Sequence, residues 1–202
     1  ILMKEMNHRI KNNLATVQSL LSLQAKSTDN HEARDILKES ENRINSIARI
    51  HGHLTQKENL TQVQVDQYIK TIIDDIKISF KHEHENIEIK YDLLAITLDM
   101  DQVTPICLIF NELVSNSFKY AFHNQKSGII QVSLVESGVN ELMLLVVDNG
   151  SGFEWTSDDQ EQDSFGLMIV KSLVNQLGGT INFESMPDIG TNIQIVIPQN
   201  IS

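Results

Sequence analysis

The sequence predicts an α+β protein: an antiparallel helical hairpin, half of a four-helix bundle, followed by an α/β sandwich with a mixed sheet and helices on one face. Three observations predict it. Apolar residues recur at helical spacing through residues 3–54. Later stretches alternate apolar and polar residues, as strands do, between further helical stretches. The charge also divides the chain: residues 1–60 hold 9 Lys and Arg against 7 Asp and Glu, and residues 61–202 hold 7 against 20.

The first helix begins near Met3. Its apolar positions step by three or four residues and form one stripe: Met3, Met6, Ile10, Leu14, Val17 and Leu21. The polar run 27–30 predicts a turn, and helical spacing then continues to about residue 56. Two helices with so short a connection form an antiparallel hairpin that leaves part of each stripe unburied. A second copy can cover that surface and complete a four-helix bundle.

A polar stretch, 55–65, is predicted to be a hinge between two domains, 1–60 and 61–202. Asp66 is predicted to cap the helix that follows. The period then changes, because "NIEIKYDL" (86–93) alternates as a strand and "AITL" provides a short partner strand.

The next helix is predicted to run from Asp101, as its cap, to Phe122, with Pro105 in or next to its first turn. On a helical wheel, one side is apolar and is expected to face the sheet: Phe110, Leu113, Val114, Phe118 and Ala121. The other side is a polar stripe: Glu112, Asn116, Lys119, Tyr120 and His123. By itself this stripe is typical of a solvated helix face.

Strands are predicted at 128–136 and 141–148, a helix from Gly166 to Leu177, and a closing hairpin from 180–185 and 191–198. Between them, the segment "FEWTSDDQEQDS" carries five acidic residues and no basic residue. It is too polar to pack and is predicted to be a short mobile lid.

The composition excludes several classes of protein. Its longest apolar runs, "ELMLLVV" and "ICLIF", are far shorter than the roughly 20 residues that cross a bilayer. No signal segment opens the chain, so no transmembrane segment and a cytoplasmic location are expected. The acidic second part disfavours nonspecific binding to nucleic acid. The chain begins with Ile rather than Met, which predicts that an upstream sensor domain is missing.

Metal sites built on cysteine or histidine are not expected. Cys107 is the only cysteine, so an internal disulfide and a cysteine-based zinc site are excluded. The pairs "HGH" (51–53) and "HEH" (82–84) offer only two imidazoles each and are predicted to be surface features.

Two glycine-containing stretches are candidates for ligand binding. In "VVDNGSGF", a strand ends in Asp148, and Gly150 and Gly152 follow it; such an end usually forms a tight turn. Neither a P-loop nor the third glycine of a dinucleotide fingerprint is present. In "SFGLMIVKSLV", Gly166 lies at the mouth of a helix, where free amides and the helix dipole favour phosphate, although a flexible entry into the helix also explains it.

Taken in order, "NELVSNSFKYAF", "DNGSGF" and "FGLMIVKSLVNQLGGTI…GTNIQIVIP" resemble the N, G1 and G2 boxes of the ATPase superfamily shared by gyrase, heat-shock chaperones, mismatch-repair proteins and histidine kinases. The resemblance covers residues 105–198 and implies ATP and Mg²⁺ as cofactors. It implies that Asp148 accepts the adenine amino hydrogen, that Gly150 and Gly152 let the backbone approach the base, and that Thr191 helps to hold adenine through water.

The same resemblance assigns the phosphate side of the site. It implies that Asn116 coordinates Mg²⁺ bridging the phosphates, that Lys119 touches phosphate, and that Tyr120 lies against the nucleotide. Gly166 and Leu167 are then the phosphate-side end of the lid. Because the lid has no basic residue, phosphate contacts must come from elsewhere, and Lys171 is one candidate, although a solvent-facing lysine accounts for it equally well. These roles agree with the chemistry, because a hard cation takes oxygen ligands and an acidic domain needs positive charge to hold ATP.

The opening helix carries a histidine on its polar side. His8 lies about 140° from the centre of the apolar stripe, and an exposed imidazole is largely neutral at cytosolic pH. "EMNHRIKNNLATVQSLLSLQA" and "ESENRINSIARIHGHL" resemble the phosphoacceptor hairpin of histidine kinases of the HRxKNN type. This implies an ATP:protein-L-histidine phosphotransferase: His8 is phosphorylated by ATP and passes the phosphoryl group to an aspartate of a response-regulator receiver domain in two-component signalling.

The sequence does not determine which residue accepts the proton from His8. The commoner histidine-kinase pattern has an acidic residue after the histidine, whereas here Arg9 follows. Glu112 ranks first, either as the base or by polarising a Mg²⁺-bound water; Glu5 is another candidate, and a neutral imidazole can also attack without a dedicated base. A related subfamily has a His near the start of its N box and a Trp-x-Glu motif before the G2 box, and it fits less well. This chain has Asn111 and Glu112 where that His would be, and "FEWTS" does not match the Trp-x-Glu motif.

Two rival functions are weighed: an ATP-binding interaction module that is silent toward His8, and a serine kinase of the anti-sigma type. Neither explains the HRxKNN hairpin. The slightly basic hairpin suits docking near the acidic pocket of a receiver domain. Its half-buried stripe favours a homodimer, whereas an upstream domain over the same surface would leave a monomer.

Overall fold

The computed structural model describes residues 2–55, 62–81, 86–123, 125, 127–154 and 165–199. The chain divides into two compact units, Ile1–Thr61 and Gln62–Ser202. No helix in these described ranges is both long enough and apolar enough to cross a membrane.

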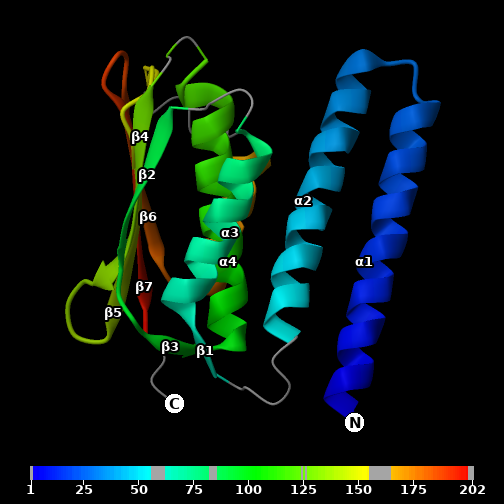
Figure 1. Cartoon of the computed structure of the whole chain (residues 1–202), viewed down its shortest axis with the longest axis horizontal. Helices are drawn as coiled ribbons and strands as arrows, with labels where there is room; N and C mark the ends of the chain where they lie inside the picture. The colour runs from blue at the N-terminus through cyan, green and yellow to red at the C-terminus, as the bar shows by residue number, and fades with distance from the viewer. Residues whose placement is uncertain are drawn as a thin grey trace. The chain divides into compact units, whose positions relative to one another are not determined.

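The first unit is a pair of helices, α1 (Leu2–Ser27) and α2 (His31–Thr55), which pack on one another as the predicted antiparallel hairpin (Figure 1). Ala25 is buried between them. Several large apolar side chains of this unit are instead 42 to 63% exposed: Val17, Leu20, Leu23 and Ile36. The two helices therefore leave apolar surface uncovered, as the sequence predicts.

The second unit is built on a five-stranded sheet. Its strands lie in the order β2-β4-β5-β7-β6, with β2 and β4 parallel and the other pairs antiparallel. The strands are β2 (Ile87–Leu93), β4 (Gly128–Glu136), β5 (Glu141–Asp148), β6 (Thr180–Met186) and β7 (Gly190–Pro198). The predicted mixed sheet is confirmed.

Three helices pack with this sheet: α3 (Val65–Ser79), α4 (Met100–Asn116) and α5 (Phe165–Gln176). Helix α4 lies between the other two and contacts both, and Figure 1 shows α3 and α4 over one face of the sheet. The apolar side predicted for the helix around residue 110 is buried throughout, and Phe110 and Phe118 are completely inaccessible to solvent. The core of the unit thus lies between α4 and the sheet.

Two predicted helix caps are wrong. The N-cap residue is Gln64 in α3 and Asp99 in α4, and neither side chain makes a capping hydrogen bond to its helix. Asp66 and Asp101 lie inside the first turns, where a carboxylate also favours a helix by interacting with its dipole. Pro105 lies in the turn that follows the first turn of α4, as predicted.

The short strand β3 (Thr97–Asp99) does not pair with the strand before it. It pairs antiparallel with β1 (Gln62–Gln64), which places Val63 opposite the buried Leu98. The predicted hinge over 55–65 therefore ends in a strand of the second unit, and its central residues, 56–61, lie outside the described part of the chain. The alternating pattern of "NIEIKYDL" predicts a strand, but it does not show with which strand "AITL" pairs.

We expect Phe110→Ala to lower the free energy of unfolding of the second unit by about 3–5 kcal/mol, because it removes a ring from a closely packed core. Urea denaturation followed by circular dichroism measures the change. Val139→Ala is the matched control, since Val139 is 90% exposed and its truncation should cost less than about 0.5 kcal/mol. Equal losses in the two variants would contradict the assigned core.

Candidate active site

Asp148 ends β5 on the face of the sheet that the helices cover. Alternate residues of a strand share a face, so Leu144, Val146 and Asp148 point the same way, and all three are buried. Asp148 is paired in register with Thr191 of β7, and Thr191 is paired with Ser185 of β6. We call Asp148, Thr191 and Ser185 the polar row. It crosses three adjacent strands where the apolar core ends.

The carboxylate of Asp148 is 6% exposed and is held by three donors. Its Oδ1 accepts from the backbone N–H of Gly150 at 3.0 Å and of Thr191 at 3.3 Å, and its Oδ2 accepts from the hydroxyl of Ser117 at 2.9 Å. Burial raises the pKa of Asp148, and the three hydrogen bonds act in the opposite direction and lower it. A carboxylate offers about four acceptor sites, so capacity remains for a donor on a ligand.

The loop after Asp148 is packed against two other segments. A Cβ atom at Gly150 would collide with the carbonyl of Ala121, which accepts from the N–H of Ser151 at 2.7 Å. Gly152 has a φ of +54°, and a Cβ atom there would collide with the carbonyl of Met186. Glycine is therefore required at both positions by the packing of the chain itself. Their predicted role in admitting a base remains a prediction.

The helix predicted over 101–122 is not a single α-helix. Helix α4 ends at Asn116 and continues as a π-helix, η1 (Ser117–Ala121). The i→i+5 turn is wider than an α turn, so a wheel of 3.6 residues per turn becomes less accurate through η1. This turn supplies two contacts of the site: the Ser117 hydroxyl to Asp148 and the Ala121 carbonyl to Ser151.

The predicted polar stripe is not a uniformly solvated face. Glu112 is buried, Asn116 and Lys119 are half-buried, and Tyr120 and His123 are exposed. A buried carboxylate and a half-buried amide, one turn apart on α4, are more consistent with one wall of a site than with a face in water. The roles assigned to these residues are not tested by their burial.

The residues predicted for the phosphate side open α5. This helix begins at Phe165, and Gly166 and Leu167 are buried in its first turn, whereas Lys171 is half-buried one turn later. The first amides of a helix have no partner within it, so they favour an anion. Residues 155–164 of the predicted lid lie outside the described part of the chain.

The predicted phosphoacceptor lies in α1, but the side chains of His8 and Glu5 are outside what the structure describes. So are residues 82–85 and the imidazoles of His51 and His53. Among the described residues, no group of three or more His, Cys, Asp or Glu side chains is arranged to hold a metal ion.

Sequence reasoning missed Ser117 and Ser185. Ser117 lies at about 140° from Glu112 on the helical wheel, within the side expected to face the sheet, but the wheel does not show that its partner there is Asp148. Ser185 could have been found from the closing hairpin, because pairing β6 with β7 places it opposite Thr191, but only once the length of the turn is known.

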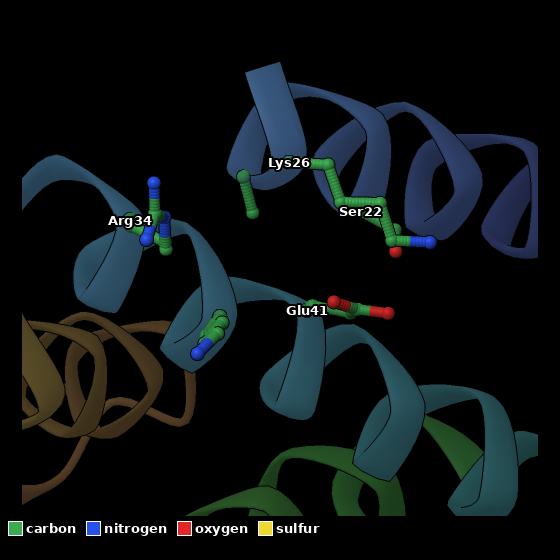
Figure 2. Close-up of a pocket in the computed structure, with 6 residues that line it drawn as sticks. Ser22, Lys26, Arg34 and Glu41 are labelled. Carbon is green, nitrogen blue, oxygen red and sulfur yellow. The ribbon is translucent and has the colours of Figure 1, made fainter. Parts of the chain in front are cut away.

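The hairpin unit contains a cavity of about 450 Å³ that the sequence did not predict. Figure 2 shows Ser22 and Lys26 of α1 on one side and Glu41 of α2 on the other. It is lined by Ser22, Ala25, Lys26, Arg34, Lys38 and Glu41. With three basic side chains and one acidic, this basic cavity suits an acidic partner.

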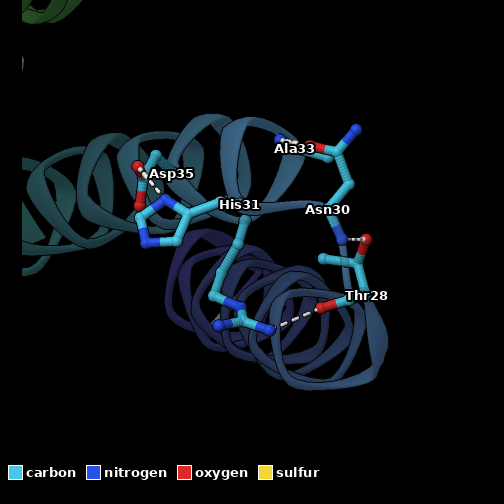
Figure 3. Close-up of polar contacts among 6 residues, drawn as sticks. Thr28, Asn30, His31, Ala33 and Asp35 are labelled. Atoms are coloured by element: carbon cyan, nitrogen blue, oxygen red, sulfur yellow. Dashed lines mark hydrogen bonds and ion pairs between the residues drawn. The ribbon is translucent and has the colours of Figure 1, made fainter.

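The turn next to the basic cavity is well fixed. Arg34 donates from Nη2 to the carbonyl of Thr28 at 2.7 Å, and Asn30 caps α2 by accepting from the N–H of Ala33 at 3.1 Å (Figure 3). The exposed His31 contacts Asp35 at 3.1 Å. The bond to Thr28 fixes the Arg34 guanidinium at the cavity, and the Asn30 cap fixes the start of the helix that carries it.

Comparisons with known proteins match both units. The family described as "Histidine kinase" matches residues 5–80, and the family described as "Histidine kinase-, DNA gyrase B-, and HSP90-like ATPase" matches residues 101–201, half of the chain. The sensor histidine kinase PdtaS of Mycolicibacterium smegmatis is 33% identical over 197 residues, which cover 96% of this chain and 39% of PdtaS. The blue-light-activated histidine kinase 2 of Erythrobacter litoralis is 27% identical over 96% of this chain and 56% of that protein.

A solved structure supports the fold. The histidine kinase domain of the Erythrobacter litoralis EL346 blue-light activated kinase has a TM-score of 0.69 at 19% identity, and the match covers 96% of this chain and 94% of that domain. The chain spans about two fifths of the length of PdtaS. It belongs to the family of histidine kinase-, DNA gyrase B- and HSP90-like ATPases, and it carries the catalytic core of a histidine kinase.

Proposed function

We propose that the second unit binds Mg²⁺ and ATP, with adenine at the polar row and the phosphates toward the start of α5. The observation that carries this proposal is Asp148: a buried carboxylate, fixed by three donors, with acceptor capacity left over. An exocyclic amino group is the donor that such an acceptor selects. The half-buried hydroxyl of Thr191 lies beside it in the polar row and supports a second contact, direct or through water.

The chemistry of the residues present fits a magnesium ion held mainly by phosphate. Mg²⁺ usually takes one or two protein oxygens together with substrate phosphates and water, so it needs no cluster of carboxylates. The proposed protein ligand of Mg²⁺ is the half-buried side-chain amide of Asn116, which lies one turn after Glu112 on α4. When bound, the ion would neutralise charge on the phosphates. Lys119 of η1 and the backbone amides of Gly166 and Leu167 are proposed to contact phosphate. Tyr120, next to Lys119, is proposed to lie against the nucleotide.

The reaction we propose is phosphoryl transfer to His8. A ring nitrogen, Nε2 or Nδ1, forms a bond to the γ-phosphorus, the bond from that phosphorus to the bridging oxygen breaks, and ADP leaves with the electron pair. The proton on the attacking imidazole must then be lost. Glu112 is the proposed acceptor, directly or through water; Glu5 remains an alternative, and so does transfer without a dedicated base. Phosphohistidine then donates the group to a receiver aspartate.

The hairpin supports proposals about partners. The basic cavity, with Lys26, Arg34 and Lys38, favours an acidic surface such as that around the aspartate of a receiver domain. The exposed Val17 and Leu20 support a homodimer that covers them, and a domain of another kind on the same surface would leave a monomer. We propose a cytoplasmic location, because the reaction consumes ATP.

Asp148→Asn is expected to abolish ATP binding measured by calorimetry, because the amide presents a donor where adenine needs an acceptor. The variant should still fold. Burial raises the pKa of Asp148, so the stability linked to this group is present at low pH and is lost as the pH rises through the raised pKa. Asparagine carries no charge that burial could destabilise. The melting temperature of the Asp148→Asn variant at pH 7 should therefore not fall below that of the parent chain.

Asp92→Asn is the matched control, since Asp92 is exposed on β2 of the same sheet and should leave ATP affinity unchanged. Unchanged affinity in Asp148→Asn would refute the proposed pocket.

Incubation with γ-labelled ATP and Mg²⁺ is expected to give an acid-labile, base-stable label that is lost in His8→Gln. His31→Gln is the control, because His31 is an exposed histidine of the same unit and should leave the label in place. An acid-stable label would favour a serine kinase instead. ATP binding without any label on His8 would favour an ATP-binding interaction module. Either result would sink the histidine kinase proposal for this chain.

The affinity for ATP is expected to fall on acidification, starting at a higher pH than an ordinary aspartate would give, because burial raises the pKa of Asp148. Ser117→Ala removes a hydrogen bond that lowers this pKa, so the fall should begin at a still higher pH. Calorimetric titrations at a series of pH values measure both profiles. Coincident profiles for the two proteins would show that Ser117 does not act on Asp148.

A further inference from the structure

Ser185 has three polar contacts although its side chain is 9% exposed. Its Oγ accepts from the backbone N–H of Phe153 at 3.0 Å, donates to the carbonyl of Gly190 at 3.3 Å, and lies 3.1 Å from the Oγ1 of Thr191. The first contact reaches the loop after Asp148, and the other two reach β7. This buried hydroxyl therefore joins β6 to both neighbouring segments of the site.

The hydroxyl of Ser185 determines whether the hydroxyl of Thr191 can donate a hydrogen bond to a ligand or only accept one. A hydroxyl has one proton and two lone pairs, and the N–H of Phe153 takes one lone pair of Ser185. If the proton of Ser185 goes to Gly190, then Thr191 donates to Ser185 and presents only lone pairs to a ligand. If the proton goes to Thr191, then Thr191 keeps its own proton for a ligand. In both cases the position of Oγ1 is fixed by Ser185.

The surrounding backbone holds Ser185 in register. The carbonyl of Ser151 accepts from the N–H of Asp188 at 2.7 Å, so the loop after Asp148 is attached to the turn between β6 and β7. The rings of Phe153 and Phe183 lie 5.7 Å apart between centroids. Both contacts attach the loop after Asp148 to the β6–β7 hairpin that carries Ser185. Thr191 is half-buried and can reach a ligand, whereas Ser185 cannot.

We propose that Ser185 is a positioning residue of the nucleotide site, which orients the Thr191 hydroxyl toward the base without touching the nucleotide. This inference rests on the proposed function, because it needs adenine at the polar row. It extends the site by one strand, from β5 and β7 to β6.

The test is a double-mutant cycle on ATP affinity, measured by calorimetry. Ser185→Ala should weaken ATP binding about tenfold, the effect of losing one oriented hydrogen bond. Ser185→Thr keeps the hydroxyl and should stay within about twofold of the parent chain. In a Thr191→Val background, Ser185→Ala should add no further loss, because the hydroxyl on which it acts is already gone. Ser133→Ala is the control, since Ser133 is a buried serine of β4 outside the polar row.

The outcomes separate the inference from the function on which it rests. Equal losses for Ser185→Ala with and without Thr191→Val would overturn it, because the residue would then act by a route other than Thr191. Loss of binding in Asp148→Asn with full affinity in Ser185→Ala would overturn this inference alone. Full affinity in Asp148→Asn would overturn both. If the melting temperature shows that Ser185→Ala does not fold, Ser185→Cys, with its weak donor, takes its place with the same expected loss.

Discussion

The buried carboxylate of Asp148 is the feature on which the arrangement of the site depends. Its three donors come from three segments: the π-helix η1, the loop that follows β5, and β7. A buried carboxylate without donors would destabilise the fold, so satisfying it also fixes these segments relative to one another. The close approach of Gly150 to Ala121 follows from the same arrangement. The proposed base-binding site is thereby assembled before any ligand arrives, which would reduce the ordering cost of binding.

Much of this fold could be predicted, because periodicity reports burial. The strands at 128–136 and 141–148 form as predicted, and the apolar side around Phe110 packs as expected. Residues 142–147 are all apolar, so the sequence does not show which face Asp148 takes. Periodicity carries no information on strand order, so the pairing of β3 with β1 was missed. It also assumes a uniform helix. The π-helix at Ser117–Ala121 departs from that assumption, and no local signal announces it. The partner of Ser117, Asp148, is distant in the sequence and was not predicted either.

The two units contribute different chemistry to the proposed reaction. The acidic second unit offers an acceptor for a base and a helix start for phosphate, whereas the hairpin offers the imidazole of His8 and a basic cavity. In the proposed reaction the nucleophile and the nucleotide belong to different units, so phosphoryl transfer would depend on their approach, a step on which a signal can act. The residue after His8 is Arg9, so an acidic neighbour cannot take the proton, and Glu112 on the nucleotide side becomes the first candidate.

The most direct measurement is a crystal structure of the chain with Mg²⁺ and a non-hydrolysable ATP analogue. The account predicts the adenine amino group within hydrogen-bond distance of the Asp148 carboxylate, roughly 2.7–3.2 Å, with the Thr191 hydroxyl on the same edge of the base. It also predicts the metal ion against the amide oxygen of Asn116. A nucleotide bound with its base away from the polar row would contradict the central claim, and so would an Asp148 still enclosed by its own donors with no ligand contact.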